Sequence, residues 1–402
     1  MTLRTAVVAT YPPRHCGIAV FTRDLVRATG IQSVVALHPA SSPAIYPLEV
    51  HHRLRRDVLA DYRTTATSLA RDGVELVSIQ HEYGIWGGGD GSHVLNFVRA
   101  LSMPSVATLH TVRRTPTPGQ HRILVELCAA VDGVVVMSRA AATLLTRVYG
   151  VSPMRVSVIP HGVPDLPRVD PDLLKPGLDL AGRAVILSFG LIGPGKGYER
   201  AIAAMPDVVA AVPDALYVIL GVTHPDLLLR EGEAYRESLV ARAIELGVGD
   251  HVRFVNRFVG PAELGRWLQA ADVFVTPYPN LEQIVSGTLS YAVGAGKAIV
   301  STPYEYAVEL LAEGRGILVT PASVSSLATA FIDLLGDPAG RERMGTRAYH
   351  FGRHMVWSEV GAAYSALFER VARSSRTSRV AGAARPLALA VLRPLPSGVL
   401  DA

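Results

Sequence analysis

Short apolar runs alternate with amphipathic stretches along most of this 402-residue chain. The apolar runs are continuous, which is typical of strands that are buried on both faces of a parallel sheet. The amphipathic stretches have helical periodicity; in the first of them, Ile18, Phe21 and Leu25 fall on one face. The pattern therefore predicts an α/β architecture in which helices cover both faces of parallel sheets.

The alternation occurs twice, once in each half of the chain. In the first half the predicted strands are Thr5–Thr10, Ser33–Leu37, Glu75–Gln80, Ser105–His110, Gly133–Met137 and Val156–Ile159, and the predicted helices are Ile18–Gly30, Arg55–Asp72, His93–Leu101, Gly119–Ala130 and Arg139–Tyr149. In the second half the predicted strands are Ala184–Phe189, Ala215–Leu220, His251–Phe254, Val273–Thr276, Ala298–Ser301 and Gly316–Val319. The helices predicted there are Tyr198–Val212, Glu231–Leu246, Pro261–Ala270, Gly287–Ala295, Ala307–Leu311, Val324–Leu335, Gly340–Tyr349 and Ser358–Ala372.

A proline-rich, aperiodic stretch, Pro164–Asp172, separates the two halves and is interpreted as part of an interdomain linker. The predicted organisation is an N-terminal open α/β domain (1–163), a linker (164–183), a second open α/β domain (184–355), a C-terminal helix (356–372) that packs back on the first domain, and a disordered basic tail (373–402). In open α/β sheets, ligands bind at the carboxyl ends of the strands. Two such sheets in tandem predict a cleft between the domains, lined by strand-to-helix turns.

The composition narrows the class of protein. Hydrophobic residues make up 49% of the chain and charged residues 18%, so both domains can build large cores. The net charge of +4 is small and spread out, which argues against nucleic acid as a partner. No apolar run approaches the roughly 18 residues that span a bilayer, Met1–Ala6 is interpreted as a first strand and not as a signal peptide, and Cys16 and Cys128 lack metal-ligand spacing. We therefore expect a cytoplasmic protein.

Two basic stretches raise a second hypothesis about location. Arginines in the tail are interleaved with Leu387 and Leu389, and His51–Arg56 is strongly basic. A disordered tail and a solvated basic face are the simplest interpretations. The alternative is a weak peripheral contact with anionic lipid at the inner face of the membrane.

The first candidate for chemistry is the turn Gly190–Gly197, which follows a predicted strand and contains four glycines and Lys196. Glycines let the backbone approach a ligand closely, and a lysine supplies a mobile positive charge suited to phosphate. The turn is not a Walker loop, because Gly197 stands where that motif has Ser or Thr, and no acidic residue ends the next strand as a dinucleotide site requires. A glycine-rich turn with a solvated lysine is the alternative interpretation.

The second candidate is the segment Glu282–Ser290, between a predicted strand and a predicted helix. Ser286 can cap that helix, which leaves the N–H groups of Gly287 and Thr288 to bind an anion. Glu282 can accept hydrogen bonds from sugar hydroxyls, unless it is simply an exposed loop residue. Together the two turns predict a site for an anionic, sugar-bearing nucleotide.

These segments resemble retaining glycosyltransferases of the large family 4, and the resemblance covers about residues 4–372. It implies the two-domain GT-B fold, an α/β architecture in which two Rossmann-like doubly wound domains face each other across a cleft. Ser290 departs from the family pattern, because the Glu-x7-Glu motif that begins at Glu282 has its second glutamate there, and Leu191 stands where arginine is usual. The most specific segments are Tyr11–Ala19 (YPPRHCGIA), Val158–Val163 (VIPHGV), the Gly190–Gly197 turn and Ser286–Pro303 (SGTLSYAVGAGKAIVSTP).

The resemblance also implies roles for individual residues. Lys196 would neutralise the diphosphate leaving group, Glu282 would bind the donor hexose, and His110 would lie beside the transferred sugar; these three form the expected catalytic set. The polar loop after the strand Glu75–Gln80 is expected on the acceptor side, through His81, Glu82 and Tyr83. The expected donor-binding residues are Gly17, Gly193, Lys196, Arg257, Phe258, Glu282, Ser286, Gly287, Thr288 and Ser290.

The implied activity is transfer of a hexose from a nucleotide-diphospho-sugar to a sugar, lipid-linked or small-molecule acceptor, with retention at the anomeric carbon. No metal site and no resident cofactor are expected: the donor is a co-substrate, and Lys196 and a helix N-terminus stabilise the leaving group. A sugar phosphorylase or a nucleotide-sugar epimerase on the same fold is one alternative. A non-catalytic sugar-nucleotide-binding protein is another, which Leu191 and Ser290 favour.

Overall fold

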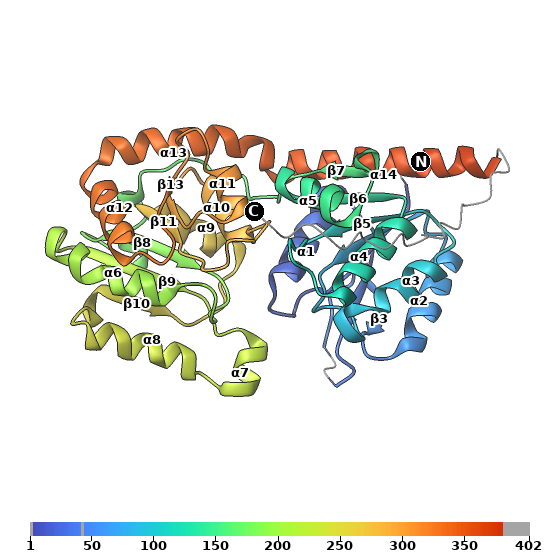
Figure 1. Cartoon of the computed structure of the whole chain (residues 1–402), viewed down its shortest axis with the longest axis horizontal. Coiled ribbons are helices and arrows are strands. Elements are labelled where there is room, and N and C mark those ends of the chain that lie inside the picture. Colours follow the sequence, from blue (N-terminus) through green and yellow to red (C-terminus); the bar gives the residue numbers. More distant parts are fainter. Residues whose placement is uncertain (1–2, 42–43, 381–402) are drawn as a thin grey trace, which may run out of the picture.

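The N-terminal half folds around one parallel sheet. The structure is a computed structural model, and it describes residues 3–41 and 44–380. Within those residues the first sheet has seven strands in the order β3-β2-β1-β4-β5-β6-β7 (Figure 1). Chain order reverses between β1 and β4, which creates a topological switch point at their carboxyl ends. The strands are β1 Thr5–Ala9, β2 Ser33–His38, β3 Val50–Arg55, β4 Leu76–His81, β5 Ser105–Leu109, β6 Gly133–Val136 and β7 Val156–Val158.

The second half builds a similar parallel sheet. Its strands have the order β10-β9-β8-β11-β12-β13, so the switch point lies between β8 and β11. The two turns that the sequence analysis selected follow these two strands. The bounds are β8 Ala184–Phe189, β9 Ala215–Leu220, β10 Val252–Val255, β11 Val273–Thr276, β12 Ala298–Ser301 and β13 Ile317–Leu318.

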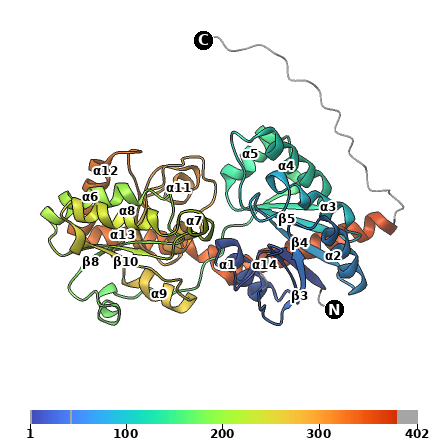
Figure 2. The same cartoon turned by 90° about the horizontal axis from the view of Figure 1, so that it is seen from below.

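Helices cover the faces of both sheets (Figure 2). Those of the first half are α1 Gly17–Thr29, α2 Leu59–Arg71, α3 His93–Ala100, α4 Pro118–Ala130 and α5 Arg139–Tyr149. Those of the second half are α6 Tyr198–Ala211, α7 Pro225–Glu231, α8 Ala234–Glu245, α9 Pro261–Ala270, α10 Gly287–Gly294, α11 Glu305–Leu310, α12 Val324–Gly336, α13 Pro338–Gly352 and α14 Trp357–Val380.

The last helix, α14, returns to the N-terminal half and lies along it in Figure 1. The hydroxyl of Tyr364 lies 3.1 Å from Thr108 Oγ1 on β5, and Leu367 packs in the same buried cluster as residues of β1 and α1. The sequence pattern predicts that this helix ends at Ala372 and that disorder begins at residue 373. That prediction is wrong for 373–380, where α14 continues to Val380; residues 381–402 lie outside the described residues.

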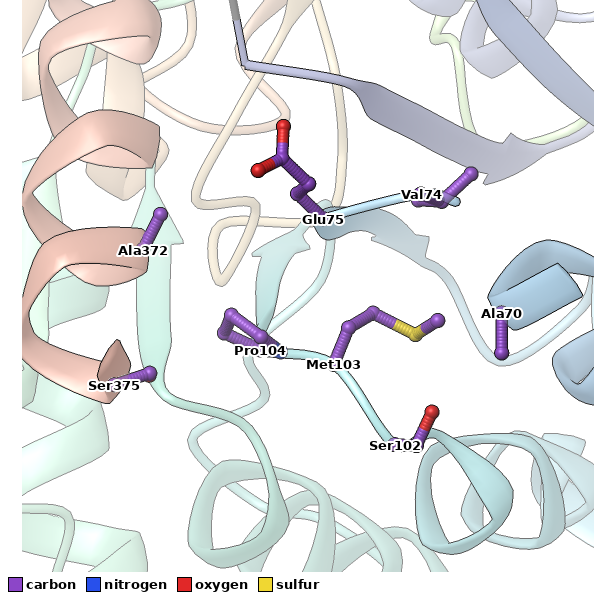
Figure 3. A pocket seen from close by; sticks show the side chains of 8 residues that line it. All are labelled: Ala70, Val74, Glu75, Ser102, Met103, Pro104, Ala372 and Ser375. Atoms are coloured by element: carbon purple, nitrogen blue, oxygen red, sulfur yellow. The ribbon is translucent and has the colours of Figure 1, made fainter. Parts of the chain in front are cut away.

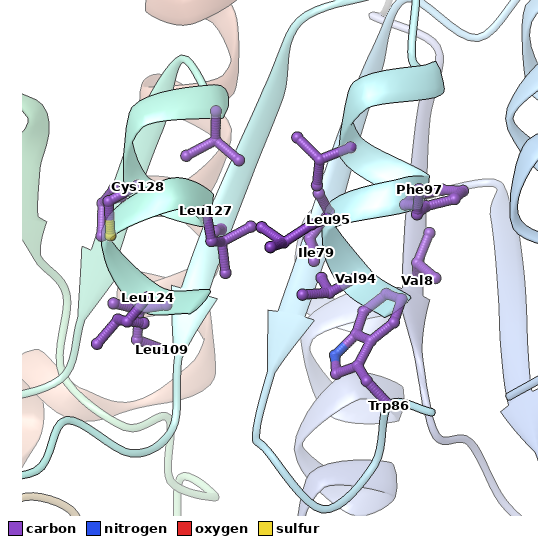
Figure 4. Packing of buried hydrophobic residues seen from close by; sticks show 14 of the residues in the cluster. Val8, Ile79, Trp86, Val94, Leu95, Phe97, Leu109, Leu124, Leu127 and Cys128 are labelled. Atoms are coloured by element: carbon purple, nitrogen blue, oxygen red, sulfur yellow. The ribbon is translucent and has the colours of Figure 1, made fainter. Parts of the chain in front are cut away.

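Buried aliphatic side chains hold the helices to the sheets. In the N-terminal half, Leu95 of α3 and Leu127 of α4 meet over Ile79 of β4 (Figure 4). Ile79 is fully buried, and such a side chain stabilises the fold by about 1.5–3 kcal/mol relative to an exposed one. The strand ends that carry the candidate site therefore stand on a rigid base.

Two elements escaped the sequence pattern. The strand β3 was missed because only Leu54 of its residues is buried and because it pairs with β2 alone, at the sheet edge. The segment His51–Arg56, interpreted as a solvated basic face, largely forms this strand. The helix predicted over Glu231–Leu246 is observed as α8, Ala234–Glu245. The short helix α7, Pro225–Glu231, was not predicted; it ends at Gly232, which has φ of +64°.

Candidate active site

The glycine turn after β8 brings Lys196 close to the end of β11. Gly197 has φ of +72°, and a Cβ there would lie 1.9 Å from the carbonyl oxygen of Pro277, so only glycine fits. Lys196 Nζ lies 4.5 Å from the centroid of the Tyr278 ring. Among the described residues, the ion pairs formed by lysines involve Lys175 and not Lys196. The positive charge of Lys196 is therefore available to an anion in the cleft.

The start of α10 forms a wall next to this turn. Ser286 caps the helix, its Oγ accepting a backbone N–H at 3.3 Å. Thr288 Oγ1 lies 2.8 Å from the Tyr278 hydroxyl and 3.1 Å from Ser286 Oγ. A Cβ at Gly190 would lie 3.5 Å from Thr288 Cγ2. The structure thus brings the predicted lysine turn and the predicted helix start together, and a helix start next to a lysine suits a phosphate.

Glu282 lies where the two halves of the protein meet. Its Oε2 is 3.3 Å from the hydroxyl of Thr115, which donates the hydrogen bond. Thr115 follows β5 of the first sheet and Glu282 follows β11 of the second. The contact shows that the carboxyl ends of the two sheets face each other, as the sequence analysis expected.

His110 lies at the same edge, directly after β5. Its Nε2 is 2.9 Å from Gln80 Oε1, and its ring packs edge-on against Phe21 with 5.0 Å between centroids. Burial, with smaller contributions from His161 and His81, lowers the pKa of His110 to about 3. The imidazole is therefore neutral near pH 7. With Nε2–H donating to Gln80, Nδ1 is left as a hydrogen-bond acceptor, which suits a sugar hydroxyl better than a phosphate.

The three residues expected on the acceptor side lie together at the end of β4. His81 is fully buried with its ring 5.0 Å from that of Tyr83, and neither of its ring nitrogens has a hydrogen-bond partner. Burial lowers the pKa of His81 to about 4 and raises that of Glu82. Glu82 accepts hydrogen bonds from the Thr111 hydroxyl and from the Tyr83 N–H. The orphaned nitrogens of His81 are therefore the unsatisfied polar atoms of this group.

The loop between β1 and α1 borders the cleft on the N-terminal side. Cys16 caps α1, its Sγ accepting a backbone N–H at 3.3 Å. Next to it Gly17 is exposed, and a Cβ placed there would meet no heavy atom within 4 Å. His15 stacks on Phe258 of the second half, with ring centroids 4.4 Å apart and planes 2° from parallel. The loop that carries Gly17 thus contacts Phe258 of the second half through His15.

Three expected donor-binding residues are either buried or bound to other side chains of the protein. Arg257 forms an ion pair with Glu263, and Gly193 is buried. Ser290 is fully buried; its hydroxyl donates to the Ser286 carbonyl at 2.9 Å and lies 2.8 Å from the Tyr306 hydroxyl. In this conformation Ser290 does not line the cleft, so the nucleotide contact expected of it would require its hydroxyl to leave these partners.

Several side chains that shape the site were not predicted from the sequence. Tyr278 and Gln80 have no motif of their own, and only the fold brings them to Lys196 and His110. His161 packs against the start of α10, since a Cβ at Gly287 would lie 2.9 Å from its Nε2. The signal for His161 was its place in the Pro-His-Gly-Val segment.

Three other kinds of feature, metal-ligand clusters, membrane-spanning helices and a pocket away from the cleft, do not locate the candidate site among the described residues. No group of three or more His, Cys, Asp or Glu side chains is arranged to hold a metal ion between residues 3 and 380, apart from 42–43. Across the same described part, no helix is long and apolar enough to cross a membrane. A pocket of about 300 Å³ lies at the amino ends of β4 and β5, away from the cleft, with Glu75, Met103 and Ala372 in its lining (Figure 3).

Two family models match the chain. "Glycosyltransferase Family 4" matches residues 17–165, and "Glycosyl transferases group 1" matches residues 174–351. Together they cover most of the chain, with one match in each half. The second match contains both turns that form the lysine and helix wall of the cleft.

Individual proteins show the same similarity. D-inositol 3-phosphate glycosyltransferase 2 of Catenulispora acidiphila is 29% identical over 257 residues, covering 62% of this chain and 58% of that protein. A GDP-mannose-dependent monoacylated alpha-(1-6)-phosphatidylinositol monomannoside mannosyltransferase of Corynebacterium glutamicum is 24% identical over 384 residues, 89% of this chain and 96% of that protein. The chain spans less than two thirds of the length of the first relatives it matches. Sucrose-phosphate synthase of Thermosynechococcus elongatus has a similar fold, with a TM-score of 0.76, 18% identity, and coverage of 92% of this chain and all of that one.

Proposed function

We propose a function from the premise that the chain belongs to the glycosyltransferase family that these two models describe, with the GT-B fold of two Rossmann-like domains. In this proposal the protein transfers a hexosyl group from a nucleotide-diphospho-sugar to a hydroxyl acceptor. Donor binding is assigned to the C-terminal half and acceptor binding to the N-terminal half. The acceptor is a sugar, a lipid-linked sugar or a small polyol.

The single observation that carries this proposal is the wall formed by Lys196 and the start of α10. Lys196 lies over Tyr278, and Tyr278 in turn contacts Thr288 in the first turn of α10. A flexible cation and free helix N–H groups within one wall are suited to the two phosphates of a nucleotide diphosphate. In this proposal Glu282, which accepts a hydrogen bond from Thr115 of the N-terminal half, also accepts hydrogen bonds from the donor sugar.

We further propose that the reaction proceeds with retention and without a metal or resident cofactor. Negative charge grows on the departing diphosphate, and preorganised donors aimed at that charge lower the barrier most. Lys196 and the α10 N–H groups supply such donors. His110, neutral because it is buried, orients the transferred sugar by hydrogen bonding and does not pair with phosphate.

The names of the relatives suggest the first substrates to test. The relative from Corynebacterium is named for GDP-mannose and for a phosphatidylinositol mannoside, and the one from Catenulispora for inositol 3-phosphate. We therefore propose GDP-mannose as the first donor and inositol-based polyols as the first acceptors, with UDP- and ADP-sugars as the competing donors.

The test is thermal unfolding of the full chain with each nucleotide sugar, in the presence of EDTA. A donor at one hundred times its dissociation constant stabilises the folded state by about 2.7 kcal/mol. We expect a rise in Tm with one donor class, lost in Lys196→Ala and in Glu282→Gln and retained in the control Arg63→Ala, which removes an exposed cation from α2. A shift that needs a divalent metal would overturn metal independence, and no shift with any donor would overturn the proposal.

One observation favours a second function, binding of a nucleotide sugar without transfer. Ser290, at the position of the second glutamate of the family motif, is buried and bonded to Tyr306. Release of nucleoside diphosphate from a bound donor separates the two functions. Slow release, with or without acceptor, indicates an enzyme; a thermal shift with no release over many hours indicates a binding protein.

We also propose a weak peripheral contact with anionic lipid at the edge of the N-terminal sheet. Ile45 and Leu48 are almost fully exposed, at 94% and 95%, and they precede the basic edge strand β3, where Arg53 lies over the Tyr46 ring. Apolar tips beside arginines suit a lipid interface. Co-sedimentation with phosphatidylserine vesicles, compared between the natural chain and Ile45→Ser/Leu48→Ser, tests this; equal sedimentation of both would overturn it.

A further inference from the structure

The helix α5 of the N-terminal half begins with backbone groups that the other half of the protein binds. The first N–H groups of a helix have no partner within the helix. Here the N–H groups of Arg139 and Ala140 donate to the two carboxylate oxygens of Glu309, at 3.0 and 3.1 Å. The next N–H, of Ala141, donates to the hydroxyl of Ser138, which caps the helix. The start of α5 is therefore complete only when the C-terminal half is docked.

Glu309 lies on α11, and other contacts join the same two surfaces. The Ser138 hydroxyl donates to the Ile284 carbonyl across the interface at 2.9 Å. Glu305, also on α11, pairs with Arg114 of the N-terminal half, with 3.1 Å from Nε to Oε1. The Arg114 side chain is 56% exposed, so this pair is weak by itself. A carboxylate at a helix start is favoured by the helix dipole as well as by hydrogen bonds, which makes Glu309 the stronger link.

The helix α11 is also tied to the segment that carries Glu282. The N–H of Glu305 donates to the Leu281 carbonyl at 3.0 Å, and the N–H of Tyr306 donates to the Gln283 carbonyl at 3.1 Å. These two bonds flank Glu282 on both sides. A movement of α11 away from α5 therefore moves Glu282 away from Thr115, its contact in the N-terminal half. Figures 1 and 2 both show α11 beside α5.

We propose that Glu309 is a positioning residue: its carboxylate, bound at the start of α5, holds the two domains closed and thereby places Glu282 in the cleft. The inference rests on the proposed function for the role of Glu282, whereas the closure itself does not. Both carboxylate oxygens of Glu309 are bound by N–H groups of α5. Its effect on the reaction is exerted through the equilibrium between open and closed domains.

The test compares the natural chain with Glu309→Ala, Glu309→Gln and the control Glu126→Gln, which neutralises a carboxylate paired with Arg99 within the N-terminal half. Without donor, we expect Glu309→Ala to have a larger radius of gyration in X-ray scattering, and Glu309→Gln an intermediate one, because an amide oxygen still accepts one hydrogen bond. The control should match the natural chain. Thermal unfolding of each variant confirms that it is folded; if Glu309→Ala is not, Glu309→Gln decides.

Kinetics give the second readout. Losing a charge-assisted contact of this kind shifts a closing equilibrium by roughly tenfold, so the KM for donor should rise about tenfold while kcat changes by less than about twofold. The double variant that exchanges the weaker pair, Arg114→Glu with Glu305→Arg, should raise the KM for donor less than either single variant does. An unchanged radius of gyration in Glu309→Ala overturns the inference, as does a fall in kcat with KM unchanged. If the natural chain turns over no donor, the proposed function fails, and the scattering result still decides the closure.

Discussion

Three buried histidines around the cleft make the stability of this protein sensitive to mild acid. Burial lowers the pKa of His81 and His161 to about 4 and that of His110 to about 3, whereas a histidine in an unfolded chain has a pKa of about 6.5. Below that value the unfolded chain binds protons that the native protein does not bind. The stability from these groups is thus complete above about pH 6.5 and is lost as the pH falls toward the folded-state pKa.

The magnitude follows from these pKa values. Between about pH 7.5 and pH 5, each histidine lowers the free energy of unfolding by about 2 kcal/mol. His81 isolates one such contribution, because neither ring nitrogen has a partner to lose and its edge-on contact with Tyr83 suits a phenyl ring equally well. We therefore expect His81→Phe to be nearly as stable as the natural chain at pH 7.5 and about 2 kcal/mol more stable than it at pH 5.

The assay is urea unfolding at both pH values, followed by tryptophan fluorescence, since Trp86 is buried in the N-terminal core and donates a hydrogen bond to the carbonyl of Gln80, the residue before His81. Groups whose contribution to the free energy of unfolding changes in the opposite direction with pH, such as Glu82 with its raised pKa, contribute equally to both variants. Their contribution therefore cancels in the comparison. His51→Phe, at an exposed ring on β3, is the control and should follow the natural chain. If His81→Phe loses as much stability on acidification as the natural chain, the reasoning from burial is refuted.

Further predictions concern the cleft. Gly197→Ala should lower Tm and abolish the donor-induced shift, because its Cβ would lie 1.9 Å from the Pro277 carbonyl and a positive φ costs about 1–3 kcal/mol more; a normal donor shift in a folded variant would contradict this. Ser290→Glu, which restores the family motif, should be destabilised by at least about 3 kcal/mol in thermal unfolding and gain no activity, because it buries an unpaired carboxylate; faster turnover would show that the side chain reaches the cleft. Phe258→Ala should lose the stack on His15, worth about 0.5–1.5 kcal/mol, and bind donor differently in calorimetry; identical calorimetric donor affinity would exclude a role for this ring.

Much of the fold was predictable, for a definite reason. Strands such as Ala184–Phe189 and Ala215–Leu220 were predicted with their observed bounds, because a strand buried on both faces must be apolar throughout. The strand β3 was not predicted, since an edge strand with one solvated face needs only one buried residue, Leu54. The end of α14 was misplaced because the sequence after Ala372, rich in arginine and serine, has no apolar periodicity that predicts a helix.

The candidate site was predictable only in part. The glycine turn and Ser286 were predictable from local sequence, because a positive φ favours glycine and a helix start favours a hydroxyl cap. The burial of Ser290 was not predictable, because its position eight residues after Glu282 says nothing about Tyr306, which lies 2.8 Å from its hydroxyl inside the fold.

Local pattern and residue chemistry thus specify two doubly wound domains, the turns that line a cleft and the lysine that suits a phosphate. These depend on neighbours within one strand, helix or turn, so a linear pattern contains them. The neutral state of His110, the burial of Ser290 and the docking of Glu309 on α5 depend instead on residues up to 170 positions apart. Desolvation and hydrogen bonding act through space, so these properties exist only once the chain has folded and the two domains have met.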